Sequence, residues 1–282
     1  MREKIIPNNQ SNTHDVTFIK DQISGFFSQN ALDLCQLTFK SGLLPDPAEA
    51  TSFVEIGIHC GKSFIPLSNM ASKFCKSFYA IDVFGMDPEN PHSTGEAGKR
   101  QFLGNLNTYS TVPEITIFQE YSTKITPEIM TEIGPIGFAS IDGSHSYEDT
   151  KNDFELMAAN LHKDGVMIVD DVFHPRYIEV VWALQEFIAS QDKIVPWLVG
   201  GNKVFFAHAD KAKELYDYMH GTAPFDMFFI KYRLFGCPVI VAATLEGKKI
   251  KRKVAYQVLQ RYPRLYNFLK NSKIARAIFK FI

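Results

Sequence analysis

The middle of the chain alternates between short apolar runs and longer segments whose apolar positions recur every three or four residues. The short runs predict buried strands, and the periodic segments predict helices with one face against a core. The predicted strands are residues 52–56, 78–82, 114–118, 136–141 and 165–169, and the predicted helices are residues 63–73, 99–109, 147–161 and 177–190. This repeated alternation predicts an α/β fold, in which helices cover both faces of a mostly parallel sheet.

The two ends of the chain depart from this alternation. We predict a helix over residues 21–39, and we expect the polar residues 1–20 to be loose or partly helical. Residues 195–199 and 203–207 flank a Gly-Gly-Asn turn and predict a closing antiparallel hairpin. We therefore divide the chain into an N-terminal helical segment (1–48), a core (49–210) and an aromatic and basic C-terminal extension (211–282).

Charge is divided unevenly along the chain, although the net charge is only −1. Residues 245–282 hold eleven Lys or Arg residues against the single acid Glu246, so this tail is about +10 and the remainder about −11. The whole chain lacks the basic character of nucleic-acid-binding proteins, and we expect no nucleic acid partner. The tail predicts a basic helical extension that contacts anionic lipid at a membrane surface or another subunit, a homo-oligomer included.

The cysteines and the N-terminus favour a cytoplasmic protein. The four cysteines show no spacing typical of metal ligands, as expected for reduced thiols in the cytosol. The polar N-terminus lacks the apolar region of a signal peptide, and the apolar run 237–245 is too short to span a bilayer. We expect cytoplasmic localisation, peripheral at the membrane surface if the tail binds lipid.

The first candidate site follows the first predicted strand, where Glu55 is followed by Gly57, Gly61 and Ser63. Glycines at a strand–helix turn allow a ligand to approach the backbone, and the helix start offers free N–H groups. The spacing matches neither the G-x-G-x-x-G fingerprint nor a P-loop. Asp82 ends the second predicted strand, where an acid can accept hydrogen bonds from both hydroxyls of a ribose. An ordinary strand–turn–helix connection with a solvated Asp is the alternative.

Acidic residues also end two later strands. Asp142 follows residues 136–141, and Asp170 and Asp171 follow residues 165–169. We expect these carboxylates to lie together, where their repulsion, in the absence of basic partners, would be relieved by Mg²⁺. His145 is a candidate general base in the same cleft. In the alternative interpretation, the two adjacent acids cap the next helix and the histidine only contacts a ligand.

Together these segments resemble the class I S-adenosylmethionine-dependent methyltransferases. Residues 53–63 resemble motif I, and residues 79–82 resemble the acidic end of the second strand. Residues 141–148, Asp153 and residues 165–171 resemble the small-molecule O-methyltransferases with Asp-Gly-x-His-x-Tyr and a later Asp-Asp, which include macrocin-type and catechol-type enzymes. The resemblance covers about residues 50–210. It implies a Rossmann-like, doubly wound sheet of about seven strands.

The resemblance also implies a role for each matching residue. Cofactor contacts are implied for Glu55, Gly57, Gly61, Ser63, Asp82, Tyr121, Ser122 and Asp142. Asp142, Asp170 and Asp171 would hold Mg²⁺, and the catalytic residues would be His145, as the base, and Asp142. Glu120-Tyr121-Ser122 stands where the family often has Gly-Asp-Ser near the adenine.

The function implied is methyl transfer from S-adenosylmethionine to a hydroxyl of a sugar or other small polar metabolite, with Mg²⁺ assistance. The partner is thus a small-molecule or glycan acceptor, over which the loop 85–98 is placed to act as a lid. Alternatives with the same fold are a metal-independent or nitrogen-directed methyltransferase, a hydroxylase-like enzyme, and a catalytically dormant methyltransferase-like binding subunit.

Overall fold

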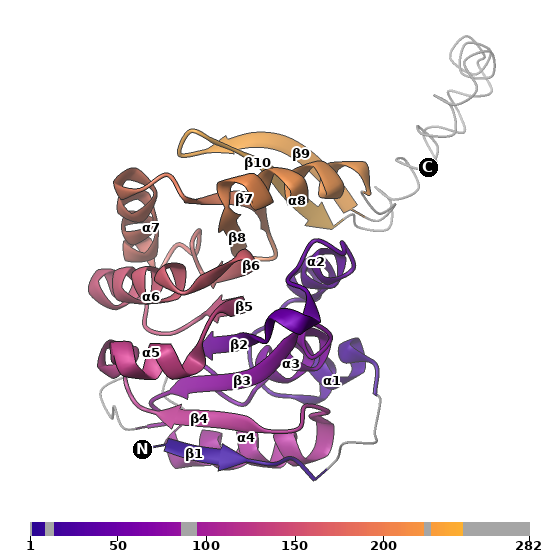
Figure 1. Ribbon diagram of the computed structural model, residues 1–282, viewed down its shortest axis with the longest axis vertical. Coiled ribbons are helices and arrows are strands. Elements are labelled where there is room, and N and C mark those ends of the chain that lie inside the picture. Colours follow the sequence, from indigo (N-terminus) through magenta and orange to yellow (C-terminus); the bar gives the residue numbers. More distant parts are fainter. Residues whose placement is uncertain (1, 9–13, 86–94, 223–226, 245–282) are drawn as a thin grey trace, which may run out of the picture.

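The computed structural model describes residues 2–8, 14–85, 95–222 and 227–244. Within these residues, ten strands form one sheet in the order β1-β4-β3-β2-β5-β6-β8-β7-β10-β9 (Figure 1). The strands are β1 (Arg2–Ile5), β2 (Thr51–Ile56), β3 (Cys75–Asp82), β4 (Ile115–Gln119), β5 (Ile136–Ile141), β6 (Leu161–Asp170), β7 (Ile194–Gly200), β8 (Lys203–His208), β9 (Met227–Leu234) and β10 (Cys237–Thr244). The helices are α1 (Val16–Gln22), α2 (Gln29–Phe39), α3 (Phe64–Ala71), α4 (Gly95–Tyr109), α5 (Pro127–Ile133), α6 (Tyr147–Ala159), α7 (Ile178–Ser190) and α8 (Ala209–Gly221).

The strands at the centre of the sheet are parallel, and the order in which the chain adds them reverses once. Strands β2 to β6 run parallel, whereas β8 is antiparallel to both β6 and β7. The chain moves outward from β2 to β3 and β4, and then returns to β5 and β6 on the other side of β2. The carboxyl ends of β2 and β5 therefore flank a topological switch point, where ligands bind in open α/β sheets. The predicted Rossmann-like, doubly wound fold with a closing hairpin is confirmed.

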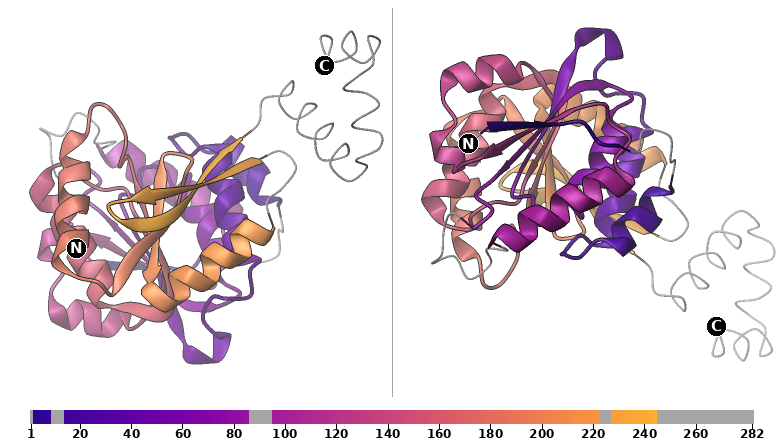
Figure 2. Two further views of the ribbon diagram at one scale, coloured as in Figure 1. Left: turned by 90° about the horizontal axis from the view of Figure 1, so that it is seen from above. Right: turned by 90° about the horizontal axis from the view of Figure 1, so that it is seen from below.

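Helices cover both faces of this sheet, as the apolar runs predicted. Every residue of β2, β4 and β5 is buried, as central strands between two helical layers require. Alternate residues serve opposite layers, so that Phe53 joins the core under α1, α2, α3, α4 and α8, while Val54 joins the core under α5, α6 and α7. Figure 2 shows the two helical layers on either side of the fanned strands.

The N-terminal region differs from its prediction in two ways. Residues 2–5 are neither loose nor helical, because they pair antiparallel with β4 and close that edge of the sheet. The helix predicted over residues 21–39 is broken into α1 and α2. Gly25, at φ +131°, turns the chain between them, and the side chain of Ser28 caps α2 by accepting from the Ala31 N–H.

The bounds of other elements also differ from the predicted ones. Helix α4 begins at Gly95, inside the predicted loop 85–98, and β6 begins at Leu161, the last residue of a predicted helix. Helix α5 was not predicted, although Thr126 caps it and Pro127 occupies its first turn. Residues 86–94 of the predicted lid lie outside the described residues.

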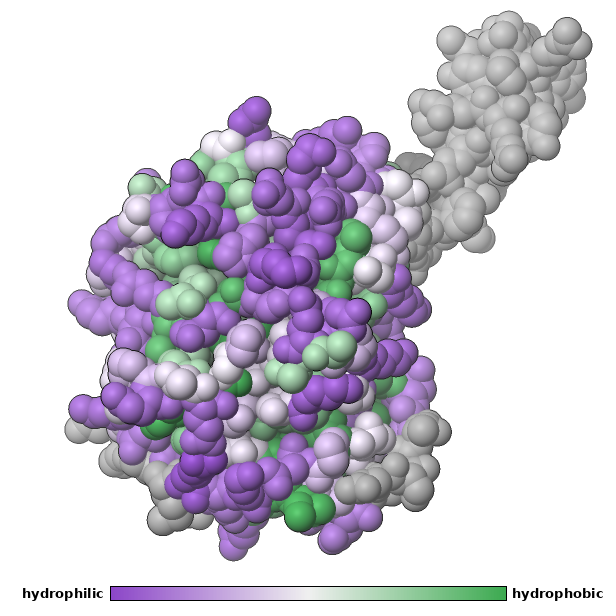
Figure 3. All heavy atoms as spheres, in the orientation of Figure 1, coloured by the Kyte–Doolittle hydropathy of each residue, from purple (hydrophilic) through white to green (hydrophobic). Residues whose placement is uncertain are grey.

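The C-terminal extension adds strands to the sheet as far as it is described. The aromatic segment after α8 forms β9, which pairs with β10, and β10 joins β7 in parallel. The basic tail 245–282 lies outside the described residues. None of the helices described here is long and apolar enough to cross a membrane. The face of the molecule in Figure 3 is mostly hydrophilic, with scattered apolar patches.

Candidate active site

The turn between β2 and α3 is organised by the carboxylate of Asp82. Its Oδ2 accepts hydrogen bonds from the N–H groups of Ile58 (2.6 Å) and His59 (2.9 Å), and its Oδ1 accepts from Phe84 (2.7 Å). One side chain therefore binds two backbone N–H groups of this turn and a third just after β3, all of which would otherwise need other partners. The residue predicted to hold a ribose thus has a structural role in the turn itself.

Glu55 lies beneath this turn and is fully buried. Ser63, just before α3, donates a hydrogen bond to Oε1, while Oε2 is buried and lacks a partner among the described residues. Burial raises the pKa of the Glu55 carboxyl to about 8. A buried carboxylate oxygen without a donor is costly, and a ligand N–H group would satisfy it.

The two glycines of the turn are required by the protein's own packing. Gly57 has φ +83°, and a Cβ there would lie 1.8 Å from the carbonyl oxygen of Asp142. Gly61 has φ +86°, and its Cβ would lie 2.7 Å from the ring of Phe102. The sequence predicted that these glycines make room for a ligand, whereas the atoms closest to them belong to β5's end and to α4.

His145 and two carboxylates converge on the neighbouring strand ends. Asp142 follows β5, Asp171 follows β6, and one ligand atom from each of the three residues lies within 4.8 Å of the others. His145 Nε2 lies 2.9 Å from Asp171 Oδ2 and 3.9 Å from Asp142 Oδ1. The imidazole stacks on the ring of Tyr177, with 3.9 Å between centroids, which fixes its plane.

Two features of this cluster bear on its chemistry. Nε2 of His145 is at ion-pair distance from Asp171 but has no aligned hydrogen-bond partner among the described residues. Burial, and then the nearby Asp170, raise the pKa of the Asp142 carboxyl. Burial also works to raise the pKa of Asp171, but contacts with His145 and Asn202 outweigh it and hold that pKa below its ordinary value.

Asp170 does not join this cluster in the way that the sequence predicted. Its Oδ2 lies 2.5 Å from the ammonium of Lys203, a buried residue. The expectation of three carboxylates without a basic partner was therefore wrong. The sequence alone does not reveal Lys203 as the partner of Asp170, because a lysine just after a hairpin turn is usually solvated and the pairing depends on the register of β6 and β8.

The segment that follows β4 packs against α6. Tyr121 is exposed, and Ser122 begins a short 3₁₀ turn and hydrogen-bonds the carboxyl of Asp153. Asp153 is fully buried, burial raises its pKa to about 7, and its Oδ2 lies beneath Gly143. The predicted contacts of Tyr121 and Ser122 with the cofactor stay predictions.

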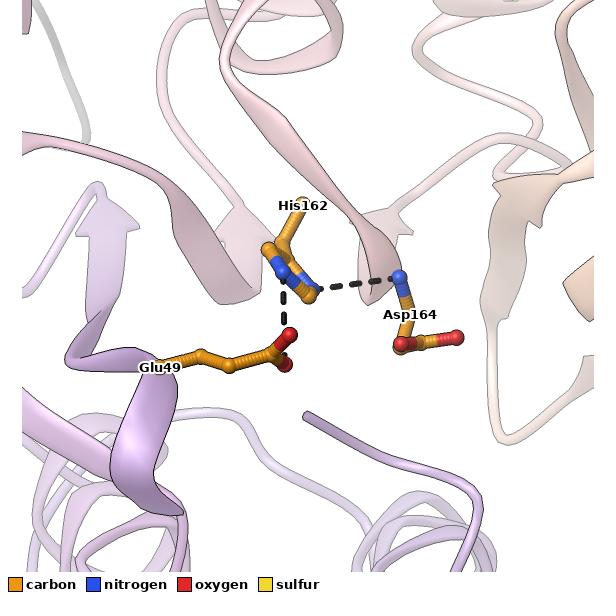
Figure 4. Close-up of side chains that lie close together, drawn as sticks. All are labelled: Glu49, His162 and Asp164. Atoms are coloured by element: carbon orange, nitrogen blue, oxygen red, sulfur yellow. Dashed lines mark hydrogen bonds and ion pairs between the residues drawn. The ribbon is translucent and has the colours of Figure 1, made fainter. Parts of the chain in front are cut away.

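A second group of possible metal ligands lies at the start of β6. His162 Nε2 lies 3.4 Å from Glu49, and its Nδ1 accepts from the Asp164 N–H at 3.2 Å (Figure 4). Lys163 and Lys211 approach the carboxylate of Asp164 at 2.8 and 2.9 Å. These lysines already balance the acids, so the group forms an ion-pair network at the opposite ends of the strands from Asp142.

Residues 54–172 match a family model described as a methyltransferase domain. This stretch is less than half of the chain, but it contains Glu55, Asp82, Asp142, His145 and Asp171. The prediction of an enzyme of the transferase class is confirmed for this domain. No curated protein sequence matches the chain.

Several solved structures are similar in fold at low identity. The TDP-rhamnose 3′-O-methyltransferase CalS11 is 15% identical, with a TM-score of 0.45 over 64% of this chain and 80% of that one. The O-methyltransferase NovP is 15% identical, with a TM-score of 0.44 over 63% and 78%. An O-methyltransferase from Bacillus cereus, solved with SAH, is 14% identical, with a TM-score of 0.45 over 68% and 87%.

Proposed function

We propose that this protein transfers a methyl group from S-adenosylmethionine to a hydroxyl of a sugar or another small polar metabolite. One observation carries the proposal. A buried Glu55 oxygen without a protein partner among the described residues, and the His145–Asp171 pair, lie at neighbouring strand ends of a methyltransferase domain. A ligand at the switch point between them would find the buried carboxyl of Glu55 on one side and the candidate base His145 on the other.

The cofactor would lie on the β2 side of this point. Glu55 Oε2 would accept a hydrogen bond from the amino group of the methionine part, which suits an orphaned carboxylate oxygen. Asp82 already accepts three backbone N–H groups, but a carboxylate has about four lone-pair sites, so a ribose hydroxyl can still bind. We propose Gly57, Gly61 and Ser63 as the frame of this pocket, with Tyr121, Ser122 and Asp142 toward the adenine and acceptor sides.

The acceptor would lie beside His145. The cofactor would supply the methyl group: as the acceptor oxygen bonds to the methyl carbon, the C–S bond in line with it would break and S-adenosylhomocysteine would be released. The hydroxyl proton would pass to Nδ1 of His145, because Nε2 faces the carboxylate of Asp171 and carries the other ring hydrogen. Asp171, 2.9 Å from Nε2, then stabilises the imidazolium, and the stack on Tyr177 keeps the ring in one orientation.

The residues present also fit a divalent cation. The three ligand atoms of Asp142, His145 and Asp171 converge, and Nε2 lacks an aligned protein partner among the described residues. Asp170 is not free to join them, because Lys203 is bound to it. A bound Mg²⁺ would lower the pKa of the acceptor hydroxyl. A neutral imidazole has one lone-pair nitrogen, so His145 cannot ligate an ion and take the proton at the same time. It is either base or ligand, and metal-independent transfer is the second candidate.

Methyl transfer from labelled S-adenosylmethionine to a panel of sugars and small hydroxyl and amine acceptors tests the proposal. We expect His145→Ala to lower the rate about 100-fold or more, with the affinity for S-adenosylhomocysteine unchanged. His220→Ala, at an exposed position of α8, is the matched control and should keep the wild-type rate.

Four outcomes would change the conclusion. Cofactor binding without transfer to any acceptor would favour the dormant binding subunit. Transfer only to amines would favour the nitrogen-directed enzyme, and a rate unaffected by EDTA would assign His145 the role of base. Equal rates for His145→Ala and wild type would contradict the proposed role of His145 in either form.

A further inference from the structure

Lys203 is a charged side chain in an enclosed position at the site. It is the first residue of β8 and stands directly opposite Asp170 in the antiparallel register with β6. Only 2% of its side chain is exposed, and its Nζ lies 2.5 Å from Asp170 Oδ2. The ring of Phe27 covers the ammonium, with 5.4 Å from Nζ to the ring centroid.

The second oxygen of Asp170 is occupied as well. Oδ1 accepts from the backbone N–H of Asp171 at 2.8 Å and from the side chain of Asn202 at 3.3 Å. An ion could use Asp170 only by displacing a buried lysine or by breaking these bonds. The carboxylate is therefore committed to protein partners on both sides.

The same bonds hold Asp171 in an uncommon backbone conformation. Asp171 has φ +57°, a left-handed value that residues other than glycine seldom adopt. Two hydrogen bonds hold it there: the N–H of Asp171 donates to Asp170 Oδ1, and the side chain of Asn202 donates to Asp171 Oδ1. In this conformation the other oxygen, Oδ2, lies beside His145 Nε2.

We propose that Lys203 is a built-in cation that withdraws the carboxylate of Asp170 from metal binding. Lys203 neutralises the carboxylate of Asp170 at the end of β6, so among the described residues of this cluster Asp142, Asp171 and His145 remain as ligands for a divalent ion. Lys203 thus limits how strongly the site binds metal. The inference builds on the proposed function, because it concerns the same site, but it can be measured without cofactor or acceptor.

Binding of Mn²⁺ to the full chain, followed by electron paramagnetic resonance and calorimetry, tests the proposal. Lys203→Met frees the carboxylate of Asp170, and we expect it to bind Mn²⁺ about tenfold more tightly than wild type, because affinity rises with the number of charged ligands. The double variant Asp170→Asn/Lys203→Met removes both charges and is the matched control. It should bind Mn²⁺ within about threefold of wild type, while Asp171→Asn should bind about tenfold more weakly.

Two results would overturn the proposal. One is a Lys203→Met variant that folds, as judged by its melting curve, and binds Mn²⁺ no better than wild type. The other is a double variant that loses as much affinity as Asp171→Asn, which would make Asp170 a ligand. The second result decides the matter even if Lys203→Met alone does not fold. Absence of methyl transfer would count against the proposed function and leave these affinities unaffected.

Discussion

Replacing Gly57 with alanine tests how closely the ends of β2 and β5 approach each other. The added Cβ would lie 1.8 Å from the carbonyl oxygen of Asp142 and 2.4 Å from its carbonyl carbon. Both are backbone atoms, which cannot turn aside as a flexible side chain would. The Asp142 N–H also donates to the carbonyl of Ile56 at 2.8 Å, so a shift of Asp142 disturbs the pairing of the two strands.

The expected cost has three parts. Alanine at φ +83° costs about 1 kcal/mol, because its Cβ is disfavoured in the left-handed region. The backbone shift that relieves the overlap costs about 1–3 kcal/mol, as in over-packed cores. A strained Asp142–Ile56 hydrogen bond adds about 1 kcal/mol. We therefore expect the free energy of unfolding to fall by about 3–5 kcal/mol, a large part of the roughly 5–15 kcal/mol typical of a folded domain.

Urea unfolding of Gly57→Ala and Gly42→Ala, followed by circular dichroism, measures this cost with its control. Gly42 has φ +70° and nothing within 4 Å of an added Cβ, so its substitution carries the backbone cost alone, about 1 kcal/mol. Similar losses for the two variants would refute the close contact between Gly57 and Asp142.

Three further predictions concern neighbouring residues. The Glu55 carboxyl has a pKa of about 8 when folded, against an ordinary 4.5, so the folded state binds more protons between these pH values and loses stability as pH rises. The free energy of unfolding of Glu55→Gln, measured in urea titrations, should therefore rise relative to that of wild type by up to about 4 kcal/mol from about pH 5 to pH 8. A difference between the two proteins that does not change with pH would contradict the raised pKa of Glu55. Phe102→Ala should lower the free energy of unfolding by about 3–5 kcal/mol, because the ring is fully buried against Gly61; a loss below about 1 kcal/mol would contradict this packing. Tyr177→Leu should lower methyl transfer up to about tenfold by releasing the His145 ring, with affinity for S-adenosylhomocysteine unchanged in calorimetry; an unaltered rate would argue against the stack.

The sequence predicted the centre of the fold better than its edges. Strands between two helical layers are buried on both faces, and accordingly all of β2 and β5 and residues 165–169 of β6 are buried and mostly apolar. Edge strands are paired and covered on fewer sides, and their patterns are weaker. Residues 2–5 alternate between exposed and part-buried positions, and most of β9 is exposed, so neither resembled a buried strand.

The sequence predicted which side chains lie together at the candidate site, but not that a lysine neutralises one of its carboxylates. Asp142, His145 and Asp171 could be placed together because parallel strands end at one edge of the sheet. The partner of Asp170 could not, since Lys203 meets it only through the register of two antiparallel strands. Such a register depends on the packing of whole layers and leaves no local mark in the sequence.

The carboxylate of Asp82 has a consequence for how variants at this position are interpreted. Because it binds the N–H groups of Ile58, His59 and Phe84, its removal leaves three donors without their acceptor before any ligand arrives. A drop in nucleoside affinity after Asp82→Ala would then combine a lost sugar contact with a collapsed loop. To measure the contact with the sugar alone, ligands that differ in their ribose hydroxyls are compared on the unmodified protein, in which the loop around Asp82 is intact.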